Sequence, residues 1–158
     1  MTDADRALLT AQLLEDEGER LTVYDDATGR PLKQGEILQG HATIGVGRNI
    51  SGNGITTDES RYLLEHDIDR CLDDLLSFPW FLDLDGVRQR VMVNLRFNLG
   101  PGRFREFKGL FAALDEQDFA RAADHLKFSL WFRQVKKRGV RLEQMMRTGR
   151  ETGRGELT

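Results

Sequence analysis

The acidic residues Glu17 and Asp26, with eight residues between them, are the strongest candidates for chemistry in this chain. A helix-like run ends at Gly18, and an extended run over residues 21–24 follows at once. Glu17 therefore falls in the last helical turn, and Asp26 falls where the extended run breaks toward a turn. Two carboxylates in different surroundings suit glycoside hydrolysis, in which one protonates the leaving oxygen and the other handles water or the sugar cation.

The surroundings of the two acids differ in the direction that such a reaction needs. Glu17 lies near the negative end of a helix dipole, and its spacing from Leu13 and Leu14 places it on the face that we expect to be buried. Both effects destabilise an ionised carboxylate, as a general acid near neutral pH requires. Asp26 lies in a polar turn, where a carboxylate stays ionised. Most acids at helix ends and turns are only solvated, so the pair alone is weak evidence.

Other groupings of reactive side chains are weaker. Three residues lack the spacing of a metal-ligand set: His41, His66 and Asp67. Three residues that suggest a hydrolase triad lie on one helical stretch without a Gly-x-Ser-x-Gly elbow: Asp124, His125 and Ser129. We therefore expect no metal and no cofactor.

The elements around the acids begin with a helix that Asp3 or Asp5 can cap and that Gly18 ends. Extended runs over residues 21–24 and 42–47 predict a small antiparallel sheet, with an irregular stretch over residues 31–42 between them and a turn at residues 51–54. The sequence Thr-Thr-Asp-Glu at residues 56–59 reads as a capping box that opens a long helix, which stops near Pro79.

Beyond Gly86 the apolar spacing is helical throughout. We predict helices over residues 87–99, 104–114, 118–128 and 140–146, with Trp131 and Phe132 in a short segment between the last two. The fold class is then α+β: a β lobe over about residues 18–55, a bridging helix over about 56–78, and a helical lobe over about 79–150 that includes the N-terminal helix. We expect one catalytic domain over residues 1–158, with a cleft between its lobes.

Composition favours an ordinary soluble globular protein, with 39% hydrophobic and 31% charged residues. Cys71 is the only cysteine, so no intrachain disulfide can form, which suits a reducing compartment. The N-terminus lacks the pattern of a signal peptide, and no apolar run approaches membrane-spanning length. We therefore expect a chain made in the cytoplasm without stable membrane insertion.

Charge is distributed unevenly along the chain. Residues 1–30 hold eight acidic residues against three arginines, whereas residues 127–154 hold nine basic residues against two acidic ones. The two ends could pack on each other, with arginines reaching toward Glu17. The basic end could also bind an anionic polymer, or it could simply be a solvated face.

Several motifs in the same order resemble the phage-type lysozymes, glycoside hydrolase family 24. They are Asp16-Glu17-Gly18, Leu21, Tyr24-x-Asp26, Thr43-Ile44-Gly45-Val46-Gly47, Asn94-Leu95-Arg96-Phe97-Asn98-Leu99-Gly100 and Ser129-x-Trp131-Phe132 with Arg138, Arg141 and Arg147-Thr148-Gly149. The resemblance covers roughly residues 7–150.

The resemblance implies a lysozyme-like fold and a muramidase that cleaves the β-1,4 bond between N-acetylmuramic acid and N-acetylglucosamine in peptidoglycan, with inversion. It implies that Glu17 is the general acid, that Asp26 is the second carboxylate, and that Thr43 helps to place the attacking water. Asn98 and Arg138 fall at positions expected to contact the saccharide.

Further positions are implied to be structural. Arg138 and Arg141 match basic positions that could pair with Glu17 and Asp16, and such a pair would favour the ionised form of Glu17, against the effect of the helix end. Arg48 stands where the family often has histidine, and we expect it to pair with Asp67.

One departure from the family pattern is large. The family has five residues between the aspartate and the threonine, whereas this chain has sixteen between Asp26 and Thr43. The enlarged hairpin over residues 31–42 could contact substrate or cap the cleft, and it leaves the role of Thr43 open.

The resemblance also implies a bacteriolytic, antimicrobial endolysin that ends a phage cycle. We expect a monomer that acts on its peptidoglycan substrate in the periplasm after a holin-type pore releases it from the host cytoplasm. The alternatives are a non-catalytic wall-binding protein on the same scaffold and a lytic transglycosylase. Nucleic-acid binding is a distant third and is not expected.

Overall fold

The chain begins with helix α1 (Asp3–Glu17), whose two ends are set by local hydrogen bonds. Thr2 is the N-cap: its hydroxyl accepts the N–H of Asp5, and the Asp5 carboxylate accepts the N–H of Thr2, each at 3.2 Å. The expected N-cap, Asp3 or Asp5, was therefore wrong: Thr2 caps the helix, and Asp5 is its partner in the capping box. Gly18, with φ +70°, ends the helix as predicted.

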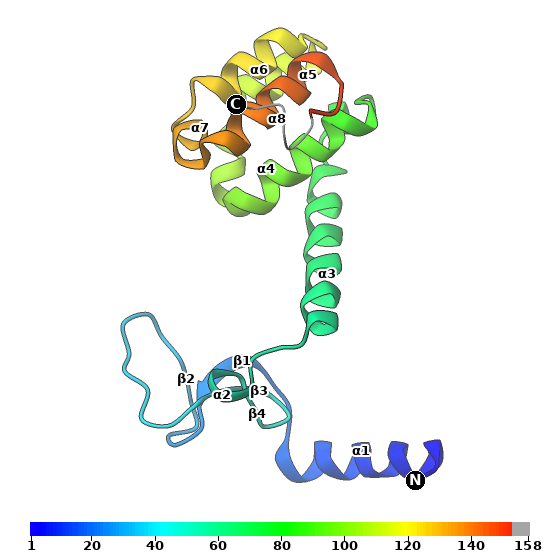
Figure 1. The fold of residues 1–158 in the computed structure, drawn as a ribbon, viewed down its shortest axis with the longest axis vertical. Coiled ribbons are helices and arrows are strands. Elements are labelled where there is room, and N and C mark those ends of the chain that lie inside the picture. Colours follow the sequence, from blue (N-terminus) through cyan, green and yellow to red (C-terminus); the bar gives the residue numbers. More distant parts are fainter. Residues whose placement is uncertain (153–158) are drawn as a thin grey trace. The chain divides into compact units, whose positions relative to one another are not determined.

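In the computed structural model, which describes residues 1–152, the chain divides into two compact units, residues 1–61 and residue 62 onward (Figure 1). The first unit holds α1 and a four-stranded antiparallel sheet, with strands β1 (Arg20–Asp25), β2 (Arg30–Pro31), β3 (Ala42–Gly45) and β4 (Arg48–Asn49) in the order β2-β1-β3-β4. In the central pair Tyr24 lies opposite Thr43, and Asp25 lies opposite Ala42.

A short helix, α2 (Ile50–Asn53), stands where a turn over residues 51–54 was predicted. The Asn49 side chain caps it by accepting the N–H of Gly52 at 2.7 Å. The Ser51 hydroxyl donates to the same Asn49 oxygen at 3.0 Å and accepts the N–H of Ala42 at 3.3 Å. These bonds join α2 to the first residue of β3.

The buried residues of the first unit are polar. Within residues 1–61, all of which the structure describes, the buried residues are Asp25 and Thr43, which are 4% and 3% exposed. Helix α1 has no buried residue, so the apolar face predicted for it is left uncovered by the rest of this unit. Hydrogen bonds therefore organise this unit more than apolar packing does.

Helix α3 (Thr57–Leu75) opens with the predicted capping box and crosses the boundary between the units. The hydroxyl of Thr56 accepts the N–H of Glu59 at 3.2 Å, and the Glu59 carboxylate accepts the N–H of Thr56 at 2.7 Å. The helix ends three residues earlier than predicted, before the 3₁₀ turn η1 (Pro79–Phe81).

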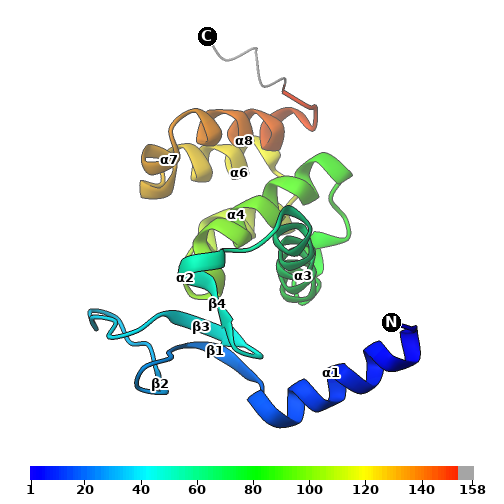
Figure 2. The same cartoon turned by 60° about the horizontal axis from the view of Figure 1, so that its bottom comes forward.

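The second unit contains the remaining helices, which are α4 (Gly86–Phe104), α5 (Lys108–Asp115), α6 (Phe119–Lys127), α7 (Leu130–Val135) and α8 (Lys137–Thr148). Gly100, with φ +73°, interrupts α4 where its end was predicted. Trp131 and Phe132 lie in a helix of their own, α7, which Ser129 caps by accepting the N–H of Phe132 at 3.1 Å. Helix α8 packs beside α6 and also against α4 and α7 (Figure 2).

The apolar core of the described residues lies in this helical unit. Its largest fully buried side chains are Leu75, Val91, Met92, Leu95, Phe104, Leu110, Leu114, Leu126 and Met146. The architecture confirms the predicted α+β class, with a small sheet and a larger helical part. Whether all 158 residues act as one catalytic domain, with α1 on the helical lobe, stays a prediction. No helix among the described residues is long and apolar enough to cross a membrane.

Candidate active site

Glu17 is the last residue of α1 and lies beside the turn between β3 and β4. Its Oε2 atom is 3.8 Å from the position that a Cβ at Gly47 would occupy, and no Cβ is present there. Gly45 and Gly47 both adopt positive φ, at +66° and +72°, so the turn itself requires glycine. The carboxylate is exposed on the unit of residues 1–61, and the partial burial expected for it against the helical lobe stays a prediction.

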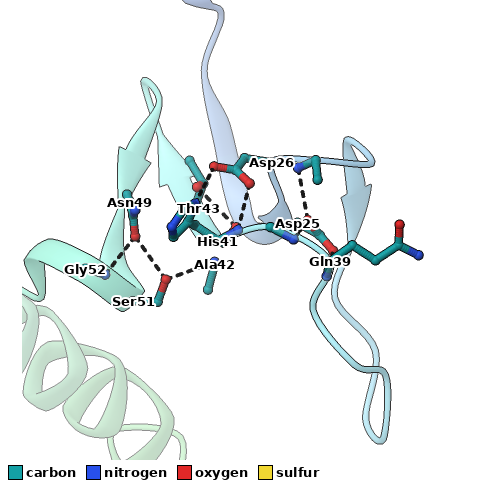
Figure 3. Close-up of polar contacts among 11 residues, drawn as sticks. Asp25, Asp26, Gln39, His41, Ala42, Thr43, Asn49, Ser51 and Gly52 are labelled. Carbon is teal, nitrogen blue, oxygen red and sulfur yellow. Dashed lines mark hydrogen bonds and ion pairs between the residues drawn. The ribbon is translucent and has the colours of Figure 1, made fainter.

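Asp26 follows the end of β1 and is held by His41, which precedes β3 (Figure 3). The backbone N–H of His41 donates to Asp26 Oδ1 at 2.7 Å, and Nδ1 of the imidazole lies 3.3 Å from Oδ2. The N–H of Asp26 donates in return to the carbonyl of His41 at 3.1 Å. The two residues thus extend the antiparallel pairing of β1 and β3 by one position.

The neighbouring acid, Asp25, is buried and accepts only backbone hydrogen bonds among those that the structure describes. The N–H of Gln39 donates to Oδ2 at 2.7 Å, and the N–H groups of Ala27 and Gly40 donate to Oδ1 at 3.0 Å. The bond from Gln39 above all, with the others, lowers the pKa of Asp25 below its ordinary value, although burial acts in the opposite direction. Asp25 therefore ties the loop before β3 to the end of β1.

Thr43 is the second buried residue of this unit and lies at the centre of the sheet. Its hydroxyl donates to the carbonyl of His41 at 3.3 Å, so Thr43 and Asp26 both contact the same residue. The enlarged hairpin therefore still returns Thr43 to the neighbourhood of the second carboxylate. Because the hydroxyl donates its hydrogen in this bond, the lone pairs of its oxygen are not used by it.

Asn98 and Trp131 are joined in the helical unit. The indole Nε1–H of Trp131 donates to Asn98 Oδ1 at 2.7 Å, which fixes the amide so that its NH₂ group points away from the indole nitrogen. Trp131 also lines a pocket of about 430 Å³, whose other walls include Leu99, His125 and Gln134. Glu17 and Asp26 belong to the other unit.

Arg48 pairs with Glu59 instead of the expected Asp67. Its Nη1 atom lies 2.5 Å from Glu59 Oε1, and its guanidinium also donates to the carbonyl of Gly54 at 2.9 and 3.1 Å. The capping box at the start of α3 also holds the Glu59 carboxylate, through the N–H and the hydroxyl of Thr56. Asp67 pairs with Arg70, one turn away on the same helix.

The other predicted pairs join residues of different units. Asp16 and Glu17 belong to the first unit, whereas Arg138 and Arg141 lie on α8 of the second. Their pairing, and contact of Arg138 with the saccharide, stay predictions. On α8 the described ion pairs belong to Arg147, which binds Asp124 at 2.5 Å and Glu143 at 2.7 Å.

Sequence reasoning missed two parts of this site. It passed over Asp25 in favour of Asp26, because the difference between these neighbouring acids comes from the hairpin, which returns to bury Asp25 and leaves Asp26 exposed. It also considered the hairpin only for substrate contact or for capping the cleft, and not for the hydrogen bonds that its residues 39–41 make to Asp25 and Asp26.

Comparison with known proteins places these features in a family. The sequence matches the phage lysozyme family over residues 15–150. It is 30% identical to the pre-baseplate central spike protein Gp5 of Enterobacteria phage T4 over 94% of this chain, but that match spans only 29% of the spike protein. It is 27% identical to probable T4-type lysozyme 1 of Dictyostelium discoideum, over 85% of this chain and 90% of that protein.

A third relative is the endolysin of Salmonella phage P22, which is 31% identical over 76% of this chain and 77% of that protein. The stretch that matches the family, residues 15–150, includes Glu17, Asp26 and Thr43 and continues past the end of α8. The chain belongs to the phage lysozyme family.

Proposed function

We propose that the protein is a peptidoglycan hydrolase, a lysozyme that cleaves the β-1,4 bond between N-acetylmuramic acid and N-acetylglucosamine. The observation that carries the proposal is a pair of carboxylates on either side of β1: one ends the helix before the strand, and the other follows the strand directly. Glu17 ends α1 beside the glycine turn, and Asp26 is fixed by His41 at the end of β1. Membership of the phage lysozyme family supports the same chemistry.

The roles follow from what each group can do. Glu17, exposed and beside Gly47, protonates the glycosidic oxygen as the bond breaks. Asp26 accepts a proton from a water molecule, and the Thr43 hydroxyl helps to place that water. A water between the second carboxylate and the sugar attacks the face opposite the leaving group, so the product anomer is inverted.

Substrate binding is assigned to the helical unit. Because the indole of Trp131 occupies the Asn98 oxygen, the amide NH₂ can donate to a carbonyl, such as that of an N-acetyl group. The pocket that Trp131 lines offers an apolar surface beside this donor. Arg138, at the start of α8, supplies a positive charge for the carboxylates of the wall peptide.

The decisive experiment compares the wild type with Glu17→Gln and Asp26→Asn on purified peptidoglycan, following release of reducing ends. We expect the wild type to release them and both variants to lose at least about 100-fold in rate, since each lacks a proton-transfer group. Glu19→Gln, which removes a charge two residues from Glu17, is the control and should retain activity. A fully active Glu17→Gln protein would refute the assignment of the acid.

The products decide the finer points. Proton NMR of the first product anomer separates inversion from retention, and an anhydro product seen by mass spectrometry would mean a lytic transglycosylase. Binding of peptidoglycan by a folded wild type without release of reducing ends would favour the non-catalytic wall-binding alternative.

We also infer that the protein acts as a bacteriolytic endolysin released through a holin-type pore at the end of a phage cycle. The similarity to the endolysin of phage P22 supports this role. Expression in a bacterial host should cause lysis only when a pore-forming protein is produced at the same time. Lysis of equal rate without the pore would show that release needs no such partner.

A further inference from the structure

The hairpin that sets this chain apart from its family returns to the sheet through three residues, Gln39, Gly40 and His41. On its outward path the backbone leaves β2 with the N–H of Leu32 bound to the carbonyl of Val23 at 3.0 Å. Nothing in the described tip, residues 33–38, contacts Asp26 by a hydrogen bond. The return path is different, because every backbone N–H in it is directed at an acid.

Three consecutive backbone N–H groups of the return path bind two consecutive carboxylates. Those of Gln39 and Gly40 donate to the two oxygens of Asp25, at 2.7 and 3.0 Å. That of His41 donates to Asp26 Oδ1 at 2.7 Å. Asp25 is buried, whereas the side chain of Asp26 is 39% exposed. Asp25 thus anchors residues 39–41, and His41 of this segment binds the solvent-exposed carboxylate of Asp26 (Figure 3).

Gly40 fits this segment because of a close approach. A Cβ at residue 40 would lie 2.1 Å from Asp26 Oδ1 and 2.9 Å from the backbone nitrogen of Ala27. Real Cβ atoms do not approach other heavy atoms so closely, so any larger residue must displace either the Asp26 carboxylate or the loop. The carboxylate therefore rests directly against the backbone of the hairpin.

The imidazole of His41 completes the contact. Its Nδ1 lies 3.3 Å from Asp26 Oδ2, so the two oxygens of Asp26 are held by two groups of one residue. The ring is 61% exposed and is therefore not required to fill a core. A neutral ring with the proton on Nδ1 can donate this bond, as can the imidazolium.

We propose that residues 39–41 are a support that fixes the orientation of the Asp26 carboxylate for reaction, with His41 as its positioning residue. This rests on the proposed function, because it assigns Asp26 a part in the chemistry. The function of the hairpin is then to hold the Asp26 carboxylate through the main chain and the imidazole of His41. Its tip is not needed to bind substrate.

The first test needs no substrate. Three-bond couplings from backbone nitrogen and carbonyl carbon to Cγ of Asp26, measured in labelled full-length protein, report how many χ1 rotamers the side chain occupies. We expect one rotamer in the wild type, and averaged couplings in His41→Ala and in Gly40→Ala. Ile37→Ala is the matched control, because Ile37 lies in the same hairpin and is 91% exposed. Unaltered couplings in both test variants would overturn the proposal.

The second test is kinetic and separates positioning from folding. His41→Ala should lower kcat by roughly 10-fold to 100-fold while KM and the melting temperature stay near wild type, because small misplacements of a reacting group are costly. His41→Asn should recover most of kcat, since its amide NH₂ can replace Nδ1 as a donor. A wild-type kcat in His41→Ala, or a loss that His41→Asn does not reduce, would overturn the positioning role.

Failure of the proposed function can be distinguished from failure of the positioning role of residues 39–41. If the folded wild type releases no reducing ends, then Asp26 has no reaction to serve and the proposed function is wrong. The coupling measurement would still decide whether residues 39–41 hold the carboxylate in one orientation.

Discussion

The carboxylate of Asp25 accepts the backbone N–H of Gln39 at 2.7 Å, fourteen residues further along the chain. This bond is one of three from backbone N–H groups, and it closes the hairpin that carries His41 to Asp26. The unit of residues 1–61 buries no large apolar side chain. The buried Asp25 carboxylate and its donors therefore hold the segments of this unit together, as an apolar core usually does.

Asp25→Asn is therefore expected to destabilise the protein at pH 7. An amide offers one acceptor oxygen in place of two, and its NH₂ group would face a backbone N–H that also donates. Chemical denaturation monitored by far-UV circular dichroism measures the loss of unfolding free energy. Glu19→Gln, which removes one exposed charge from the same unit, should unfold like the wild type. Equal stability of Asp25→Asn and the wild type would contradict the anchoring role.

The same bonds make the stabilisation depend on pH. Since the pKa of Asp25 is lowered on folding, its contribution is fully present above the unfolded-state value of about 4 and is lost as the pH falls through the lower folded value. The difference in unfolding free energy between wild type and Asp25→Asn should therefore shrink as the pH is lowered from 7 toward 2. A difference that is constant over this range would show that the charge of Asp25 contributes nothing.

Arg48→Ala is expected to lower the melting temperature by roughly 2–4 °C. Arg48 joins the end of the sheet to the first turn of α3 through Glu59 and through the carbonyl of Gly54. Arg48→Lys should recover little of the loss, because an ammonium group cannot bind both partners in the planar geometry of a guanidinium. Arg61→Ala, an exposed arginine further along α3, is the control for loss of charge. A melting temperature unchanged in Arg48→Ala would refute the link.

Trp131→Phe should weaken both stability and substrate binding. The Asn98 oxygen loses the donor of a part-buried hydrogen bond, which costs roughly 0.5–1.5 kcal/mol of unfolding free energy, and the freed amide no longer holds one orientation. We expect a several-fold rise in KM with a smaller change in kcat. Asn98→Asp separates the two effects, because a carboxylate still accepts from the indole but cannot donate to substrate. It should keep the melting temperature and raise KM, and an unchanged KM would remove Asn98 from the binding site.

The ends of helices could be predicted from the sequence because local chemistry sets them. Gly18 ends α1, the box of residues 56–59 opens α3, and Gly100 breaks α4, each as expected. These signals work within one turn of chain, so they need no knowledge of tertiary contacts. The short helices α2 and α7 were not predicted. Their caps, Asn49 and Ser129, precede stretches that are too short to show the helical spacing of apolar residues.

The partners of charged residues could not be predicted from the sequence. Asp25 and Asp26 look alike in sequence, and only the return of the hairpin, fourteen residues away, buries one and leaves the other exposed. Arg48 was expected to pair with Asp67, whereas its partner is Glu59, whose carboxylate also takes part in the capping box with Thr56. Long-range geometry decides such contacts, and apolar spacing carries no information about it.

Thr43 is the residue whose role the enlarged hairpin leaves most open, and two substitutions decide it. Thr43→Val keeps the branched shape in a site that is 3% exposed but removes the hydroxyl, whereas Thr43→Ser keeps the hydroxyl and removes a methyl group. If the hydroxyl places the attacking water, Thr43→Val should lower kcat by roughly 10-fold to 100-fold, and Thr43→Ser should stay near wild type in kcat while losing stability through the lost packing.

The reverse pattern would assign Thr43 to packing alone. The hydroxyl also donates to the His41 carbonyl at 3.3 Å, which is long for a hydroxyl donor, so the loss of this bond should change the orientation of His41 little. The Asp26 couplings measured in Thr43→Val check this point, because they should match those of the wild type. A fall in kcat with unchanged Asp26 couplings then belongs to the water and not to the second carboxylate.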